Sequence, residues 1–142
     1  MSKTTTTIWK STGLLKAVLQ TNAITSALSG AIFTIASARI GEFIGLNESL
    51  IPTGLFLILF AAAVMWTARQ QPINLKVAWA IITLDLAWVA GSVVMMLSGG
   101  LNTVGTWVVG LMADAVLLFA IGQIIGVRRL QRQSVDERLA RS

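Results

Sequence analysis

The stretch that decides the fold is residues 77–97, VAWAIITLDLAWVAGSVVMML, an apolar run that contains a single aspartate, Asp85. A helix needs about 20 predominantly apolar residues to cross the hydrocarbon core of a bilayer, and this run has that length. A charged side chain at such a depth costs about 2.5 to 3.5 kcal/mol on insertion scales, so it must be sheltered from lipid or retained for a function. The run therefore predicts a membrane-spanning helix with a polar residue near its centre.

Three further apolar runs, at residues 17–37, 51–68 and 104–127, have comparable length. The composition agrees, because 55% of the residues are hydrophobic, 12% are charged and the mean hydropathy is +0.77, which is more apolar than one soluble core requires. We therefore predict an all-α membrane protein, a four-transmembrane-helix bundle over residues 17–127. A flexible cytoplasmic segment at 1–16 and a basic cytoplasmic helix extension at 128–142 complete the predicted organisation.

The basic residues lie almost entirely on one side of the predicted bundle. Of the 11 Lys and Arg residues, Arg39 alone falls in the first or third connection between runs, and the others lie near the termini or in the second connection. The positive-inside rule then predicts that both termini are cytoplasmic and that the protein is a multi-pass protein of the bacterial cytoplasmic (inner) membrane. The lipid bilayer accounts for the positive charge, so no nucleic acid partner is expected. Arg128, Arg129 and Arg132 are expected to contact anionic lipid headgroups.

The first run also has features of a signal peptide. A lysine-bearing start, an apolar stretch and the residues Ala36, Ser37 and Ala38 resemble a secretory leader with its cleavage site. The run is longer than an ordinary leader's apolar region and it carries several hydroxyl and amide side chains. We expect a retained helix whose polar side faces other helices.

Polar side chains within the runs form the candidate functional site. Asp85 and Asp114 lie close to the middle of their spans, so they are expected at similar depths and away from lipid. Trp88 follows Asp85 on the same helical face, where it either packs in the bundle or covers the carboxylate. The alternatives for the whole set are a polar cavity or hydrogen bonds that only hold helices together. The candidate residues are Asn22, Thr25, Ser26, Ser29, Asp85, Trp88, Ser92, Asp114 and Gln123.

Small residues indicate where helices approach each other closely. In the last run Gly110, Asp114, Leu118, Gly122 and Gly126 recur at intervals of four, which predicts that Asp114 enters a helix interface. The expected helix-packing glycines are Gly30, Gly91, Gly110, Gly122 and Gly126.

Several kinds of chemistry are excluded by composition. The chain has no cysteine, which excludes disulfides, thiolate metal sites, iron–sulfur clusters and a cysteine nucleophile, and it has no histidine for metal ligation or general base catalysis. No catalytic residue set, metal site or cofactor is expected, and the chain is not expected to be an enzyme.

Three stretches resemble a known kind of protein: LQTNAITSALSG at residues 19–30, ARIGEFIGL at 38–46 and LDLAWVAGS at 84–92. Their hydropathy and their small residues are similar to those of small uncharacterised bacterial four-helix membrane proteins of a DoxX-like kind. The resemblance implies the fold and the location and no activity. Small multidrug transporters also have four spans, but their coupling glutamate lies in the first helix, where this chain has only Asn22.

Two functions are expected from these residues. The first is a non-enzymatic accessory or structural subunit of a membrane assembly, whose partners are other membrane subunits or further copies of the chain. The alternative is a small proton- or cation-coupled transporter that uses Asp85 and Asp114.

Overall fold

The computed structural model describes the backbone of residues 3–142 and the side chains of residues 13–142. In that part the chain forms five helices and no strand: α1 (Lys3–Ile35), α2 (Ser37–Ile44), α3 (Ile51–Arg69), α4 (Leu75–Leu97) and α5 (Thr103–Arg141). Four of them, α1, α3, α4 and α5, contain segments long and apolar enough to cross a membrane. The predicted fold class is confirmed, and the protein is a small multi-pass membrane protein.

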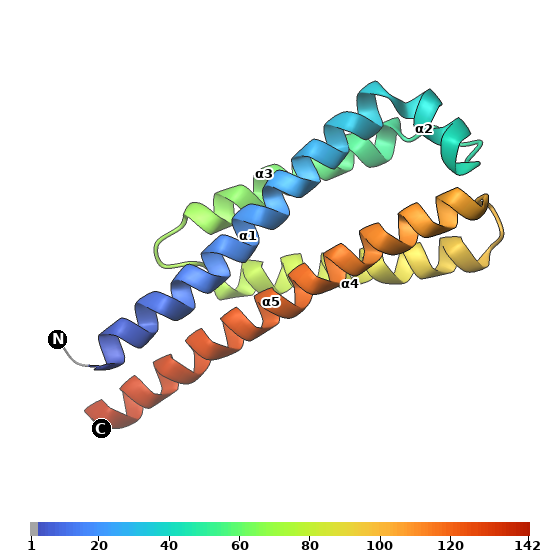
Figure 1. Ribbon diagram of the computed structural model, residues 1–142. Coiled ribbons are helices and arrows are strands. Elements are labelled where there is room, and N and C mark those ends of the chain that lie inside the picture. Colours follow the sequence, from blue (N-terminus) through green and yellow to red (C-terminus); the bar gives the residue numbers. More distant parts are fainter. Residues whose placement is uncertain (1–2) are drawn as a thin grey trace.

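The four long helices form two antiparallel pairs, as Figure 1 shows. The first pair is α1 with α3 and the second is α4 with α5, while α1 also packs along α5 and joins the pairs. Contact between α3 and α4 is sparse. The start of α1 and the end of α5 lie at the same end of the bundle in Figure 1, as an even number of crossings requires.

The described parts of both terminal segments are helical. α1 begins at Lys3 and so includes residues 3–16 of the segment that was predicted to be flexible. A helix that has already formed in the membrane extends at little cost, because only the first turn carries the penalty of nucleation. α5 has 39 residues and continues through Arg141. At 1.5 Å per residue it is about 58 Å long, which exceeds the roughly 30 Å hydrocarbon core, so its last turns extend beyond the bilayer.

α1 and α3 approach closely at a pair of glycines. A Cβ atom added to Gly30 would lie 2.6 Å from the carbonyl oxygen of Gly54, and one added to Gly54 would meet the Oγ1 atom of Thr34. Both positions therefore accept no side chain. Gly30 thus packs helices as expected, and its partner Gly54 was not among the predicted packing residues.

The glycines of the second pair differ in what they contact. A Cβ at Gly126 or Gly122 would meet Leu15 or Val18 of α1, at 3.0 and 3.3 Å, and a Cβ at Gly110 would lie 3.5 Å from Met96 of α4. These three face neighbouring helices. Gly91 is exposed and has nothing within 4 Å of an added Cβ, so the prediction that it packs against a helix is wrong. A glycine in an apolar helix does not by itself reveal which way it faces.

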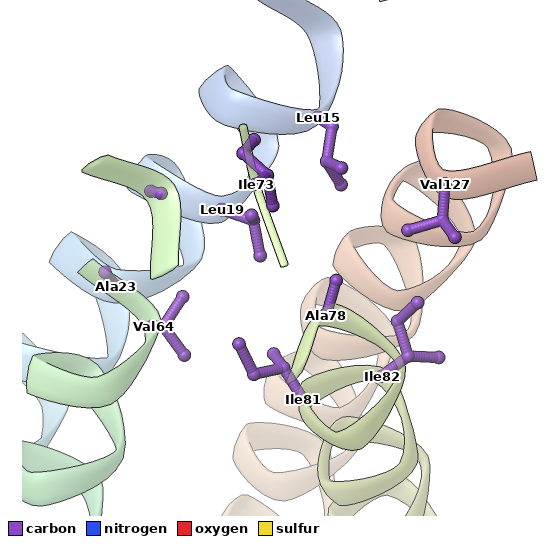
Figure 2. Packing of buried hydrophobic residues seen from close by; sticks show 10 residues of the cluster. Leu15, Leu19, Ala23, Val64, Ile73, Ala78, Ile81, Ile82 and Val127 are labelled. Atoms are coloured by element: carbon purple, nitrogen blue, oxygen red, sulfur yellow. The ribbon is translucent and has the colours of Figure 1, made fainter. Parts of the chain in front are cut away.

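A hydrophobic core occupies the half of the bundle that is nearer the termini. Its buried residues come from all four long helices and the α3–α4 connection, and Figure 2 shows how they converge. Leu15 and Leu19 of α1, Val64 of α3, Ile82 of α4 and Val127 of α5 are each at most 1% exposed. The four spans are therefore packed into one domain at this level.

Asn102, the N-cap residue directly before α5, connects helices at the opposite end of the bundle. Its Oδ1 atom accepts a hydrogen bond from Gly105 N at 2.7 Å, and its Nδ2 atom donates to the carbonyl oxygen of Phe43 at 2.9 Å. Its backbone N–H donates to the carbonyl oxygen of Ile44 at 3.0 Å. One side chain thus caps α5 and satisfies a carbonyl at the end of α2, a short helix that continues from α1 after a break at Ala36.

Replacing Asn102 with alanine is expected to lower the free energy of unfolding by about 2 kcal/mol, since it removes both the cap and the bond to Phe43. The matched control is Asn74→Ala at the start of α4. Asn74 makes only local capping bonds, and its loss is expected to cost about 1 kcal/mol. Unfolding in mixed micelles, followed by circular dichroism, measures both values. Equal losses would contradict the link between α2 and α5.

Candidate functional site

Asp85 lies at the centre of α4 and its side chain points into the bundle. The residue is 4% exposed. Its Oδ2 atom accepts two hydrogen bonds, one from Nδ2 of Asn22 in α1 at 2.8 Å and one from Nε2 of Gln123 in α5 at 2.9 Å. Three helices therefore supply one group each to this site, and the structure brings together three of the candidate residues, Asn22, Asp85 and Gln123.

A fourth residue, Ser26, orients the asparagine. Its Oγ atom donates to Oδ1 of Asn22 at 3.2 Å, so the amide presents its NH₂ group to the carboxylate. Asn22 and Gln123 are at most 1% exposed. We call Asn22, Ser26, Asp85 and Gln123 the Asp85 cluster. These hydrogen bonds offset part of the penalty for burying a carboxyl group.

The Asp85 cluster links α1 and α4, which belong to different helix pairs. α1 packs on α3 and α5, and α4 packs on α5, whereas α1 and α4 have almost no close backbone approach. The hydrogen bond from Asn22 to Asp85 connects these two helices. Because a polar group in the bundle must find its specific partner, the cluster fixes how the two helix pairs are aligned.

A small pocket of about 40 Å³ lies beside the carboxyl group. Its lining residues are Ser26, Phe56, Leu57, Phe60, Leu84, Asp85, Trp88 and Val116. A single water needs about 10 to 15 Å³ by this kind of measure, so the pocket has room for a few waters and for no sizeable substrate. Trp88 is half-buried and forms part of its wall, beside the carboxyl group.

Phe56 and Phe60 also line this pocket and were not among the candidate residues predicted from the sequence. Their rings stack with centroids 6.3 Å apart, one turn from each other on α3. The sequence feature that could have indicated them is an aromatic pair at i and i+4. Span 51–68 is apolar on every side, however, so the face that points into the bundle could not be identified from the sequence.

The other predicted polar residues take no part in the cluster. Thr25 is exposed on the outside of α1, and Ser29 is half-buried without a bond to the cluster. Ser92 is buried, but its hydroxyl donates to the backbone carbonyl of Trp88 at 2.9 Å. Hydroxyl groups in membrane helices often bond to the preceding turn in this way, so they needed no partner on another helix.

Asp114 is exposed on the outside of the bundle, so the prediction that it enters a helix interface within the chain is wrong. Residues four apart advance 400° around a helix, and each interval of four therefore rotates about 40° away from the last. Asp114 lies three such intervals from Gly126, a rotation of about 120°. Gly126 faces α1, and Asp114 faces away from the bundle. Asp85 is therefore buried inside the bundle, whereas Asp114 is exposed on its outer surface.

Basic residues follow the span of α5. Arg128, Arg129 and Arg132 are exposed directly after the buried Val127. Their guanidinium groups are free to reach lipid phosphates at the membrane surface.

The chemistry available to the site is limited to hydrogen bonding and proton or water contact at one carboxyl group. The described side chains include no group of three or more acidic residues that could hold a metal ion. Comparisons with protein-family models, with curated proteins and with solved structures found no match for the chain. The structure supports a small four-helix membrane protein, and no comparison supports the DoxX-like resemblance.

Proposed function

We propose that this protein is a non-enzymatic component of a membrane assembly, and that the face of α5 around Asp114 is where it contacts other membrane helices. The observation that carries the proposal is the position of Asp114, which is exposed in the middle of an apolar span. Lipid chains offer a carboxyl group no hydrogen-bond partner.

A neighbouring helix can supply the hydrogen-bond partner that lipid chains do not offer to Asp114. An acidic side chain at mid-membrane costs about 2.5 to 3.5 kcal/mol on insertion scales, and such residues usually face a bundle interior or pair with each other. The exposed carboxyl group of Asp114 therefore favours a further helix contact on α5.

The internal polar residues support the same function. Asp85 is held by Asn22 and Gln123, and the adjoining pocket of about 40 Å³ has room for only a few waters. The cluster is therefore suited to aligning helices, which is what a structural subunit requires.

The alternative is a transporter that uses Asp85 and Asp114 together. It needs both carboxyl groups at one site, and within a single chain one is buried and the other is exposed. Asp85→Asn distinguishes the functions, because it keeps an acceptor for the two amides and removes the acid. Unchanged assembly with no effect on a pH gradient supports the structural role, whereas loss of proton or cation coupling in a folded protein supports transport.

We also propose that the end with both termini faces the cytoplasm of a bacterial cell. The basic residues near the termini and in the α3–α4 connection support this orientation by the positive-inside rule. Arg128, Arg129 and Arg132 then contact anionic lipids of the inner leaflet.

Asp114→Leu is expected to release the chain from its assembly and to leave its fold intact, since leucine removes the polar group that needs a partner. Native mass spectrometry after mild detergent extraction measures the result. Wild-type protein should appear in a particle heavier than the single 15.2 kDa chain, and Asp114→Leu should appear mainly as the single chain.

Two controls make this measurement specific. Asp114→Asn keeps hydrogen-bonding capacity and should retain the assembly. Thr25→Leu changes an exposed polar residue of another span and should leave the particle mass unchanged. A wild-type protein that is extracted only as single chains would contradict the proposal.

A further inference from the structure

The outer face of α5 carries a regular stripe of residues. Every exposed residue between 104 and 127 belongs to it, and the intervals between them alternate between three and four. Beyond residue 127 most of the helix is exposed, and there we extend the set at the same spacing to the end of the helix. We call this set the α5 stripe: Val104, Trp107, Leu111, Asp114, Leu118, Ile121, Ile125, Arg128, Arg132, Val135 and Leu139.

Alternating intervals of three and four give a repeat of 3.5 residues per turn, which is the pattern of a helix that supercoils with a partner. The packing of α5 on α1 and α4 could leave such an apolar stripe facing lipid. Contact with lipid does not explain the exposure of three residues of the stripe. Asp114 lies in hydrocarbon, while Val135 and Leu139 lie on the charged extension beyond the span and are 53% and 68% exposed.

These three residues define what the partner must provide. It must offer a hydrogen-bonding group at the depth of Asp114, leave the membrane beside α5, and continue as a helix with apolar residues at the heights of Val135 and Leu139. The α5 helix of another copy, parallel and in register, meets all three conditions. A twofold axis would place each stripe residue opposite its own counterpart.

We propose that two copies of this protein form a parallel dimer through the α5 stripe, with the two Asp114 side chains facing each other across the axis. This inference rests on the proposed function and names its partner. A carboxylic acid can donate its O–H group to a carboxyl oxygen of the other copy, so the pair supplies the hydrogen bond that lipid lacks. A single polar residue in an apolar seam also fixes the register of two helices.

Arg128 and Arg132 occupy two positions of the stripe where α5 leaves the apolar span. In a parallel dimer their charges repel, and their long side chains extend outward to lipid phosphates. The apolar contact resumes at Val135 and Leu139.

Disulfide formation between single-cysteine variants tests the dimer directly, because the chain has no cysteine of its own. The stripe variants are Leu111→Cys, Leu118→Cys, Val135→Cys and Leu139→Cys. The controls are Leu59→Cys, which is 72% exposed on α3, and Ser134→Cys, which is exposed beside the stripe. Two Cα atoms must approach within about 7 Å to form a disulfide.

In membranes at low protein density, each stripe variant is expected to form a two-chain product at least tenfold faster than either control. Asp114→Leu in the Leu118→Cys chain should reduce the rate at least fivefold, and Asp114→Asn should preserve it. Cross-linking without a dependence on position, or none at Val135→Cys and Leu139→Cys, would overturn the parallel dimer.

A photo-reactive phenylalanine at position 111, activated in the native membrane, separates this inference from the proposed function. An adduct of two 15.2 kDa chains supports the dimer. An adduct with a different protein overturns the dimer and leaves the assembly proposal standing. Adducts with lipid alone overturn both.

Discussion

The double variant Asn22→Ala/Gln123→Leu is expected to lose about 3 to 5 kcal/mol of unfolding free energy, because it leaves the buried carboxyl group of Asp85 without either donor. The two amides bond to the same oxygen, Oδ2, at 2.8 and 2.9 Å. The single variants should each cost about 1 to 3 kcal/mol, since one donor remains. The loss in the double variant should therefore exceed that of either single variant.

A third substitution tests whether an unpaired carboxyl group is the cause. Adding Asp85→Leu to the double variant removes the group that lacks partners, and replacing all the polar groups of a buried site by apolar ones is often nearly neutral. We expect most of the lost stability to return. Thr25→Ala, on the same helix as Asn22 but exposed, should change stability by less than about 0.5 kcal/mol.

Unfolding in mixed micelles, followed by tryptophan fluorescence and circular dichroism, gives these free energies. If the double variant were as stable as wild type, the hydrogen bonds to Asp85 would not align the helix pairs. A triple variant that stays as unstable as the double variant would indicate lost packing instead of an unpaired acid.

Gly30→Val is expected to produce the second large effect, a loss of about 3 kcal/mol, through separation of α1 from α3. A Cβ at this position would lie 2.6 Å from the carbonyl oxygen of Gly54 and 3.0 Å from the backbone nitrogen of Ile58. Backbone atoms cannot change rotamer, so the helices must move apart, and overpacking of this kind costs about 1 to 3 kcal/mol.

Gly91→Ala is the matched control, because it is also a glycine in a membrane span but has nothing within 4 Å of an added Cβ. Alanine is favoured over glycine in helices by up to about 1 kcal/mol, so this variant should be as stable as wild type or slightly more stable. The same unfolding measurement compares the two. A stable Gly30→Val protein would contradict the close approach of α1 and α3.

The four spans could be predicted because length and hydropathy alone decide whether a helix can cross a bilayer. The partners of Asp85 could be predicted as residue types, since a buried carboxyl group requires donors and spans contain few of them. The choice of Asn22 and Gln123 over Thr25 and Ser29 depends on which way each helix is turned. The rotation of each helix is set by its packing against its neighbours, and the sequence does not show which helices are neighbours.

Asp114 was misplaced for a geometric reason. Intervals of four align residues over one or two turns, but the accumulated rotation of about 40° per interval separates Asp114 from Gly126. The alternation of three and four on the α5 stripe is present in the sequence as well. It could be recognised only after the structure showed which residues of the span are exposed.

The accessibility of the α5 stripe to dissolved oxygen in the bilayer tests the central claim, that this face is covered by protein. Leu111 on the stripe and Leu59 on α3 are 65% and 72% exposed in the single chain, so spin labels at Leu111→Cys and Leu59→Cys start from nearly equal exposure. In native membranes we expect oxygen to broaden the label at 111 several-fold less than the label at 59, and we expect Asp114→Leu to remove the difference. Equal broadening at the two positions in the otherwise wild-type protein would contradict the claim.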